Sequence, residues 1–297
     1  MRYGFPYLVK SKNQLVSAIS VMSILLISIS VDSGSFSPLF PIAEGQPERL
    51  LPVLLIHGYR STHNVWDGWV NQLDDLGIQA KAVSFEDDPT TVVNEDECGS
   101  AEDHANQLTQ IVVDFKEETG FDKINIITHS KGGLDARLYL ADNPSNEDVE
   151  NLIMIGTPNE GSPLADRFYG FDACKPAVYD LRTYSPVLEA EKNEHTTYYT
   201  IASDWVSVYG YILPFVWLAQ DINCPYPSYW FDLEGWNFLA FQYNGRNEII
   251  GPDDGIVPVE SVEEEGEYQS LGRTDNCHTN MFTNEEFDRA IGVLKLH

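Results

Sequence analysis

Basic residues are scarce in this chain. Its 297 residues include 18 lysines and arginines against 46 aspartates and glutamates, so the formal net charge is −28. A surface this acidic repels the phosphate backbone of nucleic acids, which argues against DNA or RNA as a partner. It also repels anionic lipid, which argues against a basic amphipathic membrane binder. What remains is a solvated acidic surface that favours solubility.

Cysteine is scarce as well, and its spacing argues against one class of metal site. None of the four cysteines stands in a C-x-x-C pair, so a zinc site is not supported and no metal ligand is assigned. No Gly-X-Y period points to collagen, and 12% aromatic residues are too many for a disordered chain. With 43% apolar residues the chain can bury a sizeable core, in one large domain or two ordinary ones.

An uncharged run near the N-terminus predicts export. Three basic residues precede residues 15–31, and the first acidic residue is Asp32. Residues 1–31 therefore read as a signal peptide, and residues 32–50, rich in serine and proline, as a linker. An uncleaved membrane anchor stays open, because no clear A-x-A site follows. We expect an extracytoplasmic protein, secreted or anchored, in which four cysteines predict two disulfides.

After the linker, segments of strand and helix character alternate over residues 51–297. The hydrophobic patterns predict strands at 51–56, 79–85, 123–128, 151–155 and 197–202. They predict helices at 62–76, 100–120 and 131–141, and a last helix capped by Asn284. This alternation favours an α/β fold with a mostly parallel central sheet flanked by helices on both faces.

Two insertions interrupt the alternation, at about 160–195 and 205–250. The second holds four of the six tryptophans and is too long for an ordinary loop. It reads either as a small helical insertion with its own aromatic core, or as a cap that lines an apolar substrate groove or rests on lipid. The two interpretations are compatible.

The sequence Thr128-His-Ser-Lys-Gly-Gly133 suggests a nucleophile. Ser130 stands between a buried strand and a helix, where a sharp turn projects its hydroxyl above the sheet edge. The helix dipole and the backbone N–H of Lys131 then favour negative charge beside it. Gly132 lets the helix and the strand approach closely. The alternative is that Ser130 is an ordinary helix N-cap.

A second motif, His57-Gly58-Tyr59, follows the first predicted strand. In this place the backbone N–H of Tyr59 would face that of Lys131, so the two would form an oxyanion hole. A glycine turn beside a packed histidine is the alternative interpretation.

Four ordered motifs together resemble the α/β-hydrolase fold, and within it the bacterial and archaeal triacylglycerol lipases and esterases. They are Pro52-Val-Leu-Leu-Ile-His-Gly-Tyr59, His129-Ser-Lys-Gly-Gly133, Ile155-Gly-Thr-Pro-Asn-Glu-Gly-Ser162 and Asp254-Gly-Ile-Val-Pro258. One position departs from the usual G-x-S-x-G pattern, because Thr128 replaces its first glycine.

The resemblance implies a catalytic triad in the order serine, acid, histidine. His278 lies in a loop before the last helix and matches the position of the base, whereas His129 is expected to point away from Ser130. Asp254 matches the acid in its Asp-Gly-x-Val-Pro turn. Asp204 and Asp253 remain alternatives.

The implied activity is hydrolysis of carboxylic esters of apolar acyl chains, through an acyl-enzyme and without a cofactor. Some relatives bind structural calcium, for which no ligands are assigned here. An acyltransferase, phospholipase or thioesterase stays open within the same chemistry, as does a catalytically silent lipid-binding homologue. A lipid or ester is the expected partner, with possible membrane contact through the N-terminus or the cap.

This topology also suggests how the cysteines pair. Cys98 and Cys277 would both lie at the carboxyl edge of the sheet, and Cys174 and Cys224 in the two insertions. We therefore expect Cys98–Cys277 and Cys174–Cys224 disulfides.

Overall fold

The computed structural model describes residues 50–86, 98–170, 174–204, 210–212, 215–217 and 252–295. The chain divides into two compact units between Gln46 and Pro47, and all described residues belong to the second. The predicted signal peptide or anchor and almost all of the linker lie outside the described residues. So does the insertion at 205–250, apart from the antiparallel backbone pair β6 (Gly210–Ile212) and β7 (Phe215–Trp217).

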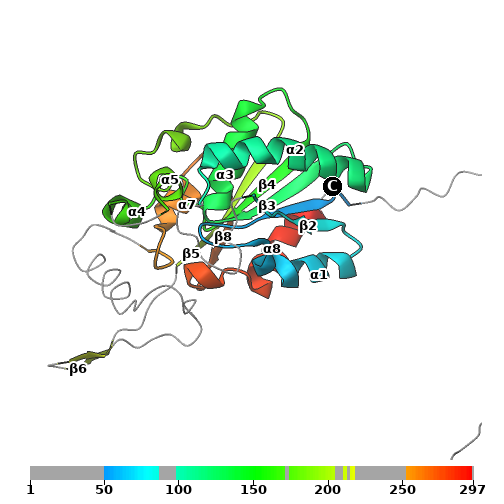
Figure 1. The fold of residues 1–297 in the computed structure, drawn as a ribbon. Helices are drawn as coiled ribbons and strands as arrows, with labels where there is room; N and C mark the ends of the chain where they lie inside the picture. Colours follow the sequence, from blue (N-terminus) through cyan, green and yellow to red (C-terminus); the bar gives the residue numbers. More distant parts are fainter. Residues whose placement is uncertain are drawn as a thin grey trace, which may run out of the picture. The chain divides into compact units, whose positions relative to one another are not determined.

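A six-stranded sheet forms the centre of the fold (Figure 1). Its strands are β1 (Val53–Ile56), β2 (Ala80–Ala82), β3 (Ile124–His129), β4 (Val149–Ile155), β5 (Thr197–Ser203) and β8 (Gln269–Thr274). They stand in the order β2-β1-β3-β4-β5-β8, and each neighbouring pair is parallel. The predicted α/β class with a mostly parallel sheet is confirmed.

Helices cover both faces of this sheet (Figure 1). α2 (Ala101–Thr119) and α3 (Lys131–Asp142) pack on one face, and α1 (Asp67–Asp75) and α8 (Asn284–Leu294) on the other. Successive strand residues point to opposite faces. Ile126 accordingly lies in the core under α2 and α3, whereas Ile127 lies in the core over α1 and α8.

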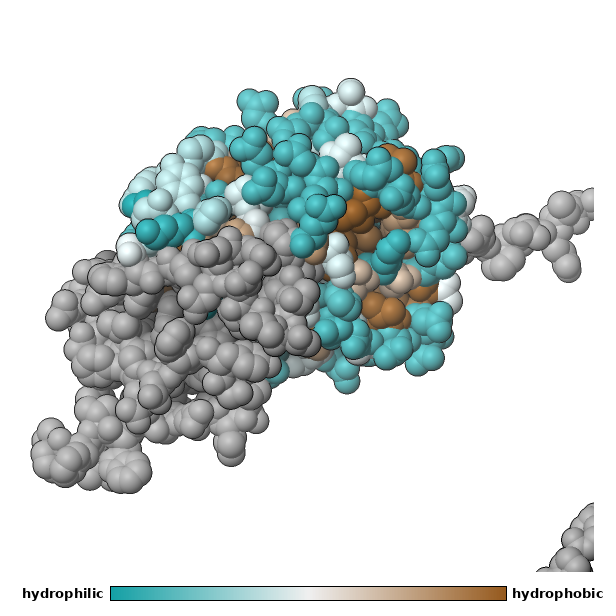
Figure 2. Space-filling model, viewed as in Figure 1, coloured by the Kyte–Doolittle hydropathy of each residue, from teal (hydrophilic) through white to brown (hydrophobic). Residues whose placement is uncertain are grey.

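Shorter helices connect these elements. They are η1 (His63–Trp66), α4 (Pro163–Phe168), α5 (Lys175–Asp180), η2 (Pro186–Glu189), α7 (Val259–Glu263) and η3 (His278–Asn280). Among the described residues, no helix combines the length and apolar character that a membrane crossing requires. Figure 2 shows that the described part of one face is mostly hydrophilic, with hydrophobic residues in smaller patches between.

Local sequence signals explain where the two long helices begin and end. Ser100 Oγ accepts a hydrogen bond from the backbone N–H of Asp103, whose carboxylate accepts one from the N–H of Ser100. This capping box starts α2, and Gly120 ends it at φ +72°, as predicted. For α8 the prediction was wrong by one residue. Thr283 is the cap, and its Oγ1 accepts from the N–H of Glu285.

One strand prediction needs correction, and one strand was not predicted. The strand expected at 79–85 is limited to Ala80–Ala82, because only these residues pair with β1. The strand β8 was not predicted. Its sequence, Gln-Ser-Leu-Gly-Arg-Thr, is polar and half exposed, so it carries no hydrophobic alternation that would reveal a strand.

The predicted disulfide pairs are wrong. The structure joins Cys98 to Cys174, with 5.1 Å between their Cα atoms, and each of these residues was expected to bond a different partner. The bond forms because the start of α5 lies against the start of α2. The last residue of α5 contacts α2 as well, because Asp180 Oδ2 accepts a hydrogen bond from the backbone N–H of Ala101 at 2.6 Å. Cys277 is also disulfide-bonded.

Candidate active site

Ser130 occupies the turn between β3 and α3. Its backbone has φ +54° and ψ −128°, a conformation that residues other than glycine rarely adopt. The N–H of Ser130 donates to the carbonyl of Ile155 at 2.9 Å, which holds this turn against the end of β4. Thr128 fits two residues earlier with no exposed surface, so replacing the usual glycine leaves the sharp turn in place.

Two glycines bring this turn close to the end of β1. A Cβ on Gly132 would overlap the carbonyl oxygen of His57. A Cβ on Gly58 would stand 2.7 Å from that of Ser130, closer than such atoms approach. Only glycine fits at either position, because the two backbones lie too close for a side chain. The His57-Gly58-Tyr59 loop therefore lies directly beside Ser130.

His278 links Ser130 to Asp254 inside the protein. Its Nε2 lies 2.9 Å from Ser130 Oγ, and its Nδ1 lies 2.7 Å from Asp254 Oδ2. All three residues are buried. The three side chains expected to form the triad are thus brought into one hydrogen-bonded row, although 148 positions separate Ser130 from His278 along the chain.

The backbone around Asp254 holds its carboxylate toward His278. Oδ1 accepts hydrogen bonds from the N–H groups of Ile256 (2.9 Å) and Val257 (2.7 Å), which leaves Oδ2 for the histidine. The carbonyl of Asp254 also accepts from the N–H of His278 at 3.0 Å. Its backbone and its side chain therefore both contact the same histidine.

The two alternative acids differ in what the structure shows of them, a side-chain contact for Asp253 and a backbone contact for Asp204. Asp253 Oδ1 accepts from the N–H of Gly255 at 2.7 Å, within its own turn. The backbone N–H of Asp204 donates to the carbonyl of Thr274 at 2.8 Å, where β5 ends beside β8.

His129 has a role that sequence reasoning missed. Its Nε2 donates to the backbone carbonyl of His278 at 2.8 Å, and its ring lies 4.8 Å from the ring of His278. Burial, followed by the neighbouring His278, lowers the pKa of His129 well below its usual value, so the ring is neutral near pH 7. The N–H on Nε2 therefore helps to fix the segment that carries His278. The only sequence signal was its position beside Ser130.

The expected oxyanion donors lie on the two elements that meet at Ser130. Lys131 opens α3, and the first N–H groups of a helix have no partner within it. Tyr59 follows Gly58, and the next residue, Arg60, has φ +49° and donates from Nε to Cys174 Sγ at 3.2 Å. His57 is buried at the end of β1, with Nδ1 3.0 Å from the carbonyl oxygen of Gly58.

Metal coordination is not suggested by the part of the chain that the structure describes. No group of three or more histidine, cysteine, aspartate or glutamate side chains is arranged there to hold an ion.

Comparison with known families adds to this geometry. Residues 52–213, more than half of the chain, match the family described as palmitoyl protein thioesterase. The chain belongs to this family. The match includes Ser130 and both predicted oxyanion residues, and it ends before Asp254 and His278.

The curated relatives of this chain include triacylglycerol lipases. The enzyme of Burkholderia plantarii is 32% identical over 44% of this chain and 36% of its own length. The enzyme of Pseudarthrobacter phenanthrenivorans is 34% identical over 39% of this chain and 35% of its own length. Triacylglycerol lipase 2 of Saccharomyces cerevisiae is 31% identical over 58% of this chain and 51% of its own length. The chain thus spans about a third to a half of the length of these relatives.

Among solved structures, the mature Bacillus licheniformis lipase BlEst2 aligns with a TM-score of 0.60 at 19% identity. The alignment covers 86% of this chain and 96% of that one. The propeptide form aligns with a TM-score of 0.63 at 18% identity, over 86% and 52%. These alignments confirm the expected α/β-hydrolase fold, and together with the matched family and the curated lipases they confirm the resemblance to lipases and esterases.

Proposed function

We propose that this protein is an exported serine hydrolase that cleaves carboxylic esters of apolar acyl chains, as lipases and carboxylesterases do. The observation that carries the proposal is the hydrogen-bonded row Ser130–His278–Asp254, with distances of 2.9 Å and 2.7 Å. A serine hydroxyl is a weak nucleophile until a base takes its proton, and a base works best when an acid orients it.

The first half of the reaction forms an acyl-enzyme. Ser130 Oγ attacks the ester carbonyl while His278 Nε2 takes the hydroxyl proton, and Asp254 stabilises the imidazolium through Nδ1. The carbonyl electron pair moves onto oxygen, which the N–H groups of Tyr59 and Lys131 stabilise. His278 then gives its proton to the leaving alcohol, and the acyl group stays on Ser130.

Water completes the cycle by the same groups. His278 takes a proton from water, the hydroxide attacks the acyl carbonyl, and the same two N–H groups stabilise the second oxyanion. Collapse releases the carboxylic acid and returns the proton to Ser130. No step requires a metal or an organic cofactor.

The comparisons support a substrate with an apolar acyl group, and they also support a second candidate activity. The curated relatives are named triacylglycerol lipases, whereas the matched family is described as a palmitoyl protein thioesterase. A thioester reacts through the same acyl-enzyme, with a thiol as the leaving group. A thioesterase acting on long acyl chains is therefore the second candidate, and its leaving group distinguishes it from a lipase.

Export is part of the proposal. It is supported by the uncharged run at residues 15–31 and by the Cys98–Cys174 disulfide, because disulfides persist mainly outside the cytoplasm.

Ser130→Ala and two aspartate variants test the triad. We expect a fluorophosphonate probe to label the wild type at Ser130, and Ser130→Ala to lose about six orders of magnitude in kcat. Asp254→Asn should lose about 10³- to 10⁴-fold, because His278 then lacks its orienting acid. Asp204→Asn is the matched control. Full activity in Asp254→Asn together with loss in Asp204→Asn would overturn the acid assignment.

A panel of substrates separates the two candidate activities. Nitrophenyl esters from acetate to palmitate, with and without detergent, are compared with an S-palmitoyl peptide and its O-palmitoyl serine counterpart. A lipase or carboxylesterase cleaves the oxygen ester at least as well. Strong preference for the S-palmitoyl peptide would assign the thioesterase reaction, and a wild type that fails to label and cleaves neither would indicate a silent homologue.

A further inference from the structure

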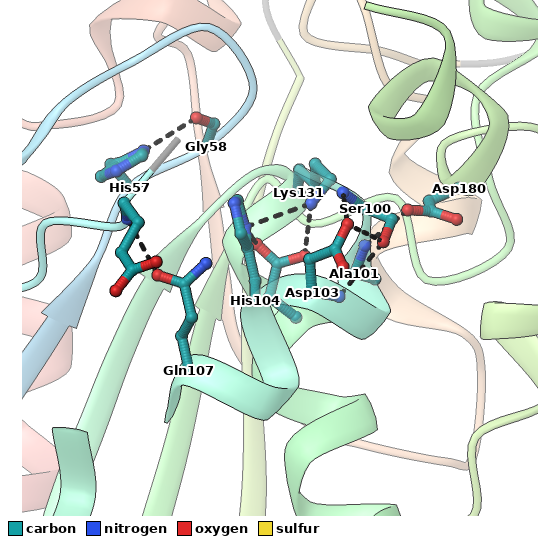
Figure 3. A network of polar contacts seen from close by, with 11 residues as sticks. His57, Gly58, Ser100, Ala101, Asp103, His104, Gln107, Lys131 and Asp180 are labelled. Carbon is teal, nitrogen blue, oxygen red and sulfur yellow. Dashed lines mark hydrogen bonds and ion pairs between the residues drawn. The ribbon is translucent and has the colours of Figure 1, made fainter. Parts of the chain in front are cut away.

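The side chain of Lys131 ends in a buried group of charges that the proposed mechanism does not use. Its Nζ donates to Asp135 Oδ1 at 2.6 Å, one turn further along α3, and the two side chains are only 2% and 1% exposed. From α2, His104 places Nδ1 2.7 Å from Asp135 Oδ2. Figure 3 shows Lys131 and His104 meeting between the two helices. We refer to Lys131, Asp135 and His104 as the Lys131 cluster.

Protons in the Lys131 cluster can be assigned from its geometry. Burial opposes ionisation of Asp135, but the Lys131 ammonium and then His104 outweigh it, so the pKa of Asp135 is lowered and its carboxylate is charged. Because both carboxylate oxygens accept, Nδ1 of His104 carries a proton. Lys131 Nζ lies 3.3 Å from that nitrogen, which is then a contact between two donors. The charges of lysine and aspartate cancel, and their positions are mutually fixed.

The Lys131 cluster also connects the two sides of the expected oxyanion hole. The ring of His104 stacks on Phe85, with centroids 3.8 Å apart and planes 4° from parallel. Phe85 in turn meets His57 edge-on at 5.6 Å. His57 precedes the Gly58-Tyr59 loop, and Lys131 itself supplies the opposite donor. A row of side-chain contacts thus links the two N–H groups behind the reacting serine.

A third element anchors this row. Asp180 of α5 accepts from the N–H of Ala101 at 2.6 Å, which fixes the first turn of α2, where His104 lies. Burial raises the pKa of Asp180, and the N–H of Ala101 partly offsets this effect. Figure 3 shows Asp180 on the far side of Lys131 from His57.

Given the serine hydrolase proposed above, we propose that Lys131, Asp135 and His104 are positioning residues that hold the two oxyanion donors in place. The N–H of Lys131 cannot turn without moving a side chain that is buried and bonded to Asp135. Oxyanion donors act only when they lie within hydrogen-bond distance of the developing charge. A displacement of about 1 Å can cost about 100-fold in rate. Loss of the cluster should therefore lower kcat and leave substrate binding nearly unchanged.

Lys131→Met and Asp135→Asn test the proposal. Each should lower kcat by about 10- to 100-fold while KM changes less than about twofold. A trifluoromethyl ketone with the preferred acyl chain supplies a second measurement. Ser130 Oγ bonds to its ketone carbon, the serine proton passes to His278, and the carbonyl electron pair becomes an oxyanion. Its inhibition constant should rise by the same factor as kcat falls.

The choice of two variants separates positioning from a simple charge effect. Lys131→Met leaves an unpaired negative charge on Asp135, and Asp135→Asn leaves an unpaired positive charge on Lys131. If these charges acted directly on the oxyanion, the two variants would change kcat in opposite directions. Positioning predicts a loss in both. His104→Asn, which keeps a donor to Asp135 but loses the stack on Phe85, should show a smaller loss of the same kind. The His104→Asn variant tests the proposal if either Lys131→Met or Asp135→Asn fails to fold.

Val112→Ala is the matched stability control, because it removes volume from the buried core side of α2, two turns away from His104. It should lower Tm and leave kcat unchanged. Unaltered kcat and inhibition constant in Lys131→Met and Asp135→Asn, or opposite changes in the two, would overturn the inference while the wild type remains active. A wild type that is neither labelled at Ser130 nor active would overturn the proposed function and this inference with it.

Discussion

The backbone of Ser130 is held in a conformation that costs energy. A non-glycine residue at φ +54° is strained by about 1–3 kcal/mol. The N–H bond to Ile155 and the close packing of Gly58 and Gly132 hold it there. In this conformation Ser130 Oγ lies 2.9 Å from His278 Nε2.

Gly156 gives a sharp test of the space around the triad. It has φ +58°, and an added Cβ would stand 3.0 Å from Met281 Sδ and 3.3 Å from His278 Nδ1. Gly156→Ala should therefore disturb the bond between His278 and Asp254 and lower kcat by about tenfold or more. It should also lower Tm, because alanine is strained at positive φ.

Gly292→Ala is the control for Gly156→Ala. It lies in α8 with nothing within 4 Å of an added Cβ. Alanine there should leave kcat unchanged and stabilise the helix by about 0.5–1 kcal/mol. Equal activity in both variants would show that the tight contact at Gly156 does not matter.

At the scale of elements, the Cys98–Cys174 disulfide ties the segment before α2 to the start of α5. The two cysteines are 76 residues apart, so the bond closes a long loop in the unfolded chain. The loop-entropy relation gives about 4.5 kcal/mol for that length, as an upper bound. The Tm of a Cys98→Ser/Cys174→Ser variant should be lower than that of the wild type by about 9–18 °C in a thermal scan. An unchanged Tm would contradict this expectation.

Elements with strong local signals were predictable, and those that depend on neighbours were not. The capping box of Ser100 with Asp103 and the C-cap at Gly120 mark the two ends of α2 by local hydrogen bonds. The strand β8 pairs with β5 although its own residues are polar, so only the completed sheet reveals it. The disulfide pairing depends on how α5 packs against α2, which no local pattern reports.

At the scale of the whole molecule, the α/β class and the meeting of Ser130, Asp254 and His278 followed from motif order. In parallel sheets of this kind, loops after successive strands meet at one edge. The bond from His129 to the carbonyl of His278 was not predictable, because it links residues 149 positions apart. The ion pair of Lys131 with Asp135 could have been predicted from the sequence, since the two residues are four positions apart on one helix.

The stability of the molecule should fall in acid in two stages. Since the pKa of His129 is lowered by burial, the unfolded chain binds a proton below about pH 6.5 that the folded protein excludes. Stability should therefore fall as the pH drops from 7 toward 5. The pKa of Asp135 is also lowered, so its contribution is kept above about pH 3.9 and lost in stronger acid.

Urea unfolding between pH 7.5 and 5 checks the first stage. His129→Gln keeps a donor to the carbonyl of His278 but cannot titrate, so its stability should change less with pH than that of the wild type. Parallel curves for the two proteins would contradict the role given to His129.

The outer strand β8 has a consequence for how the protein behaves at high concentration. Exposed sheet edges are templates on which a second chain can add a strand. Here the register between β5 and β8 shifts beside Gly272, which has φ +95°, and Arg289 already donates to the carbonyls of Leu271 and Arg273. A neighbouring copy therefore finds these acceptors taken and the edge irregular. Together with a formal charge of −28, this disfavours edge-to-edge aggregation and fibre growth at the β8 end of the sheet.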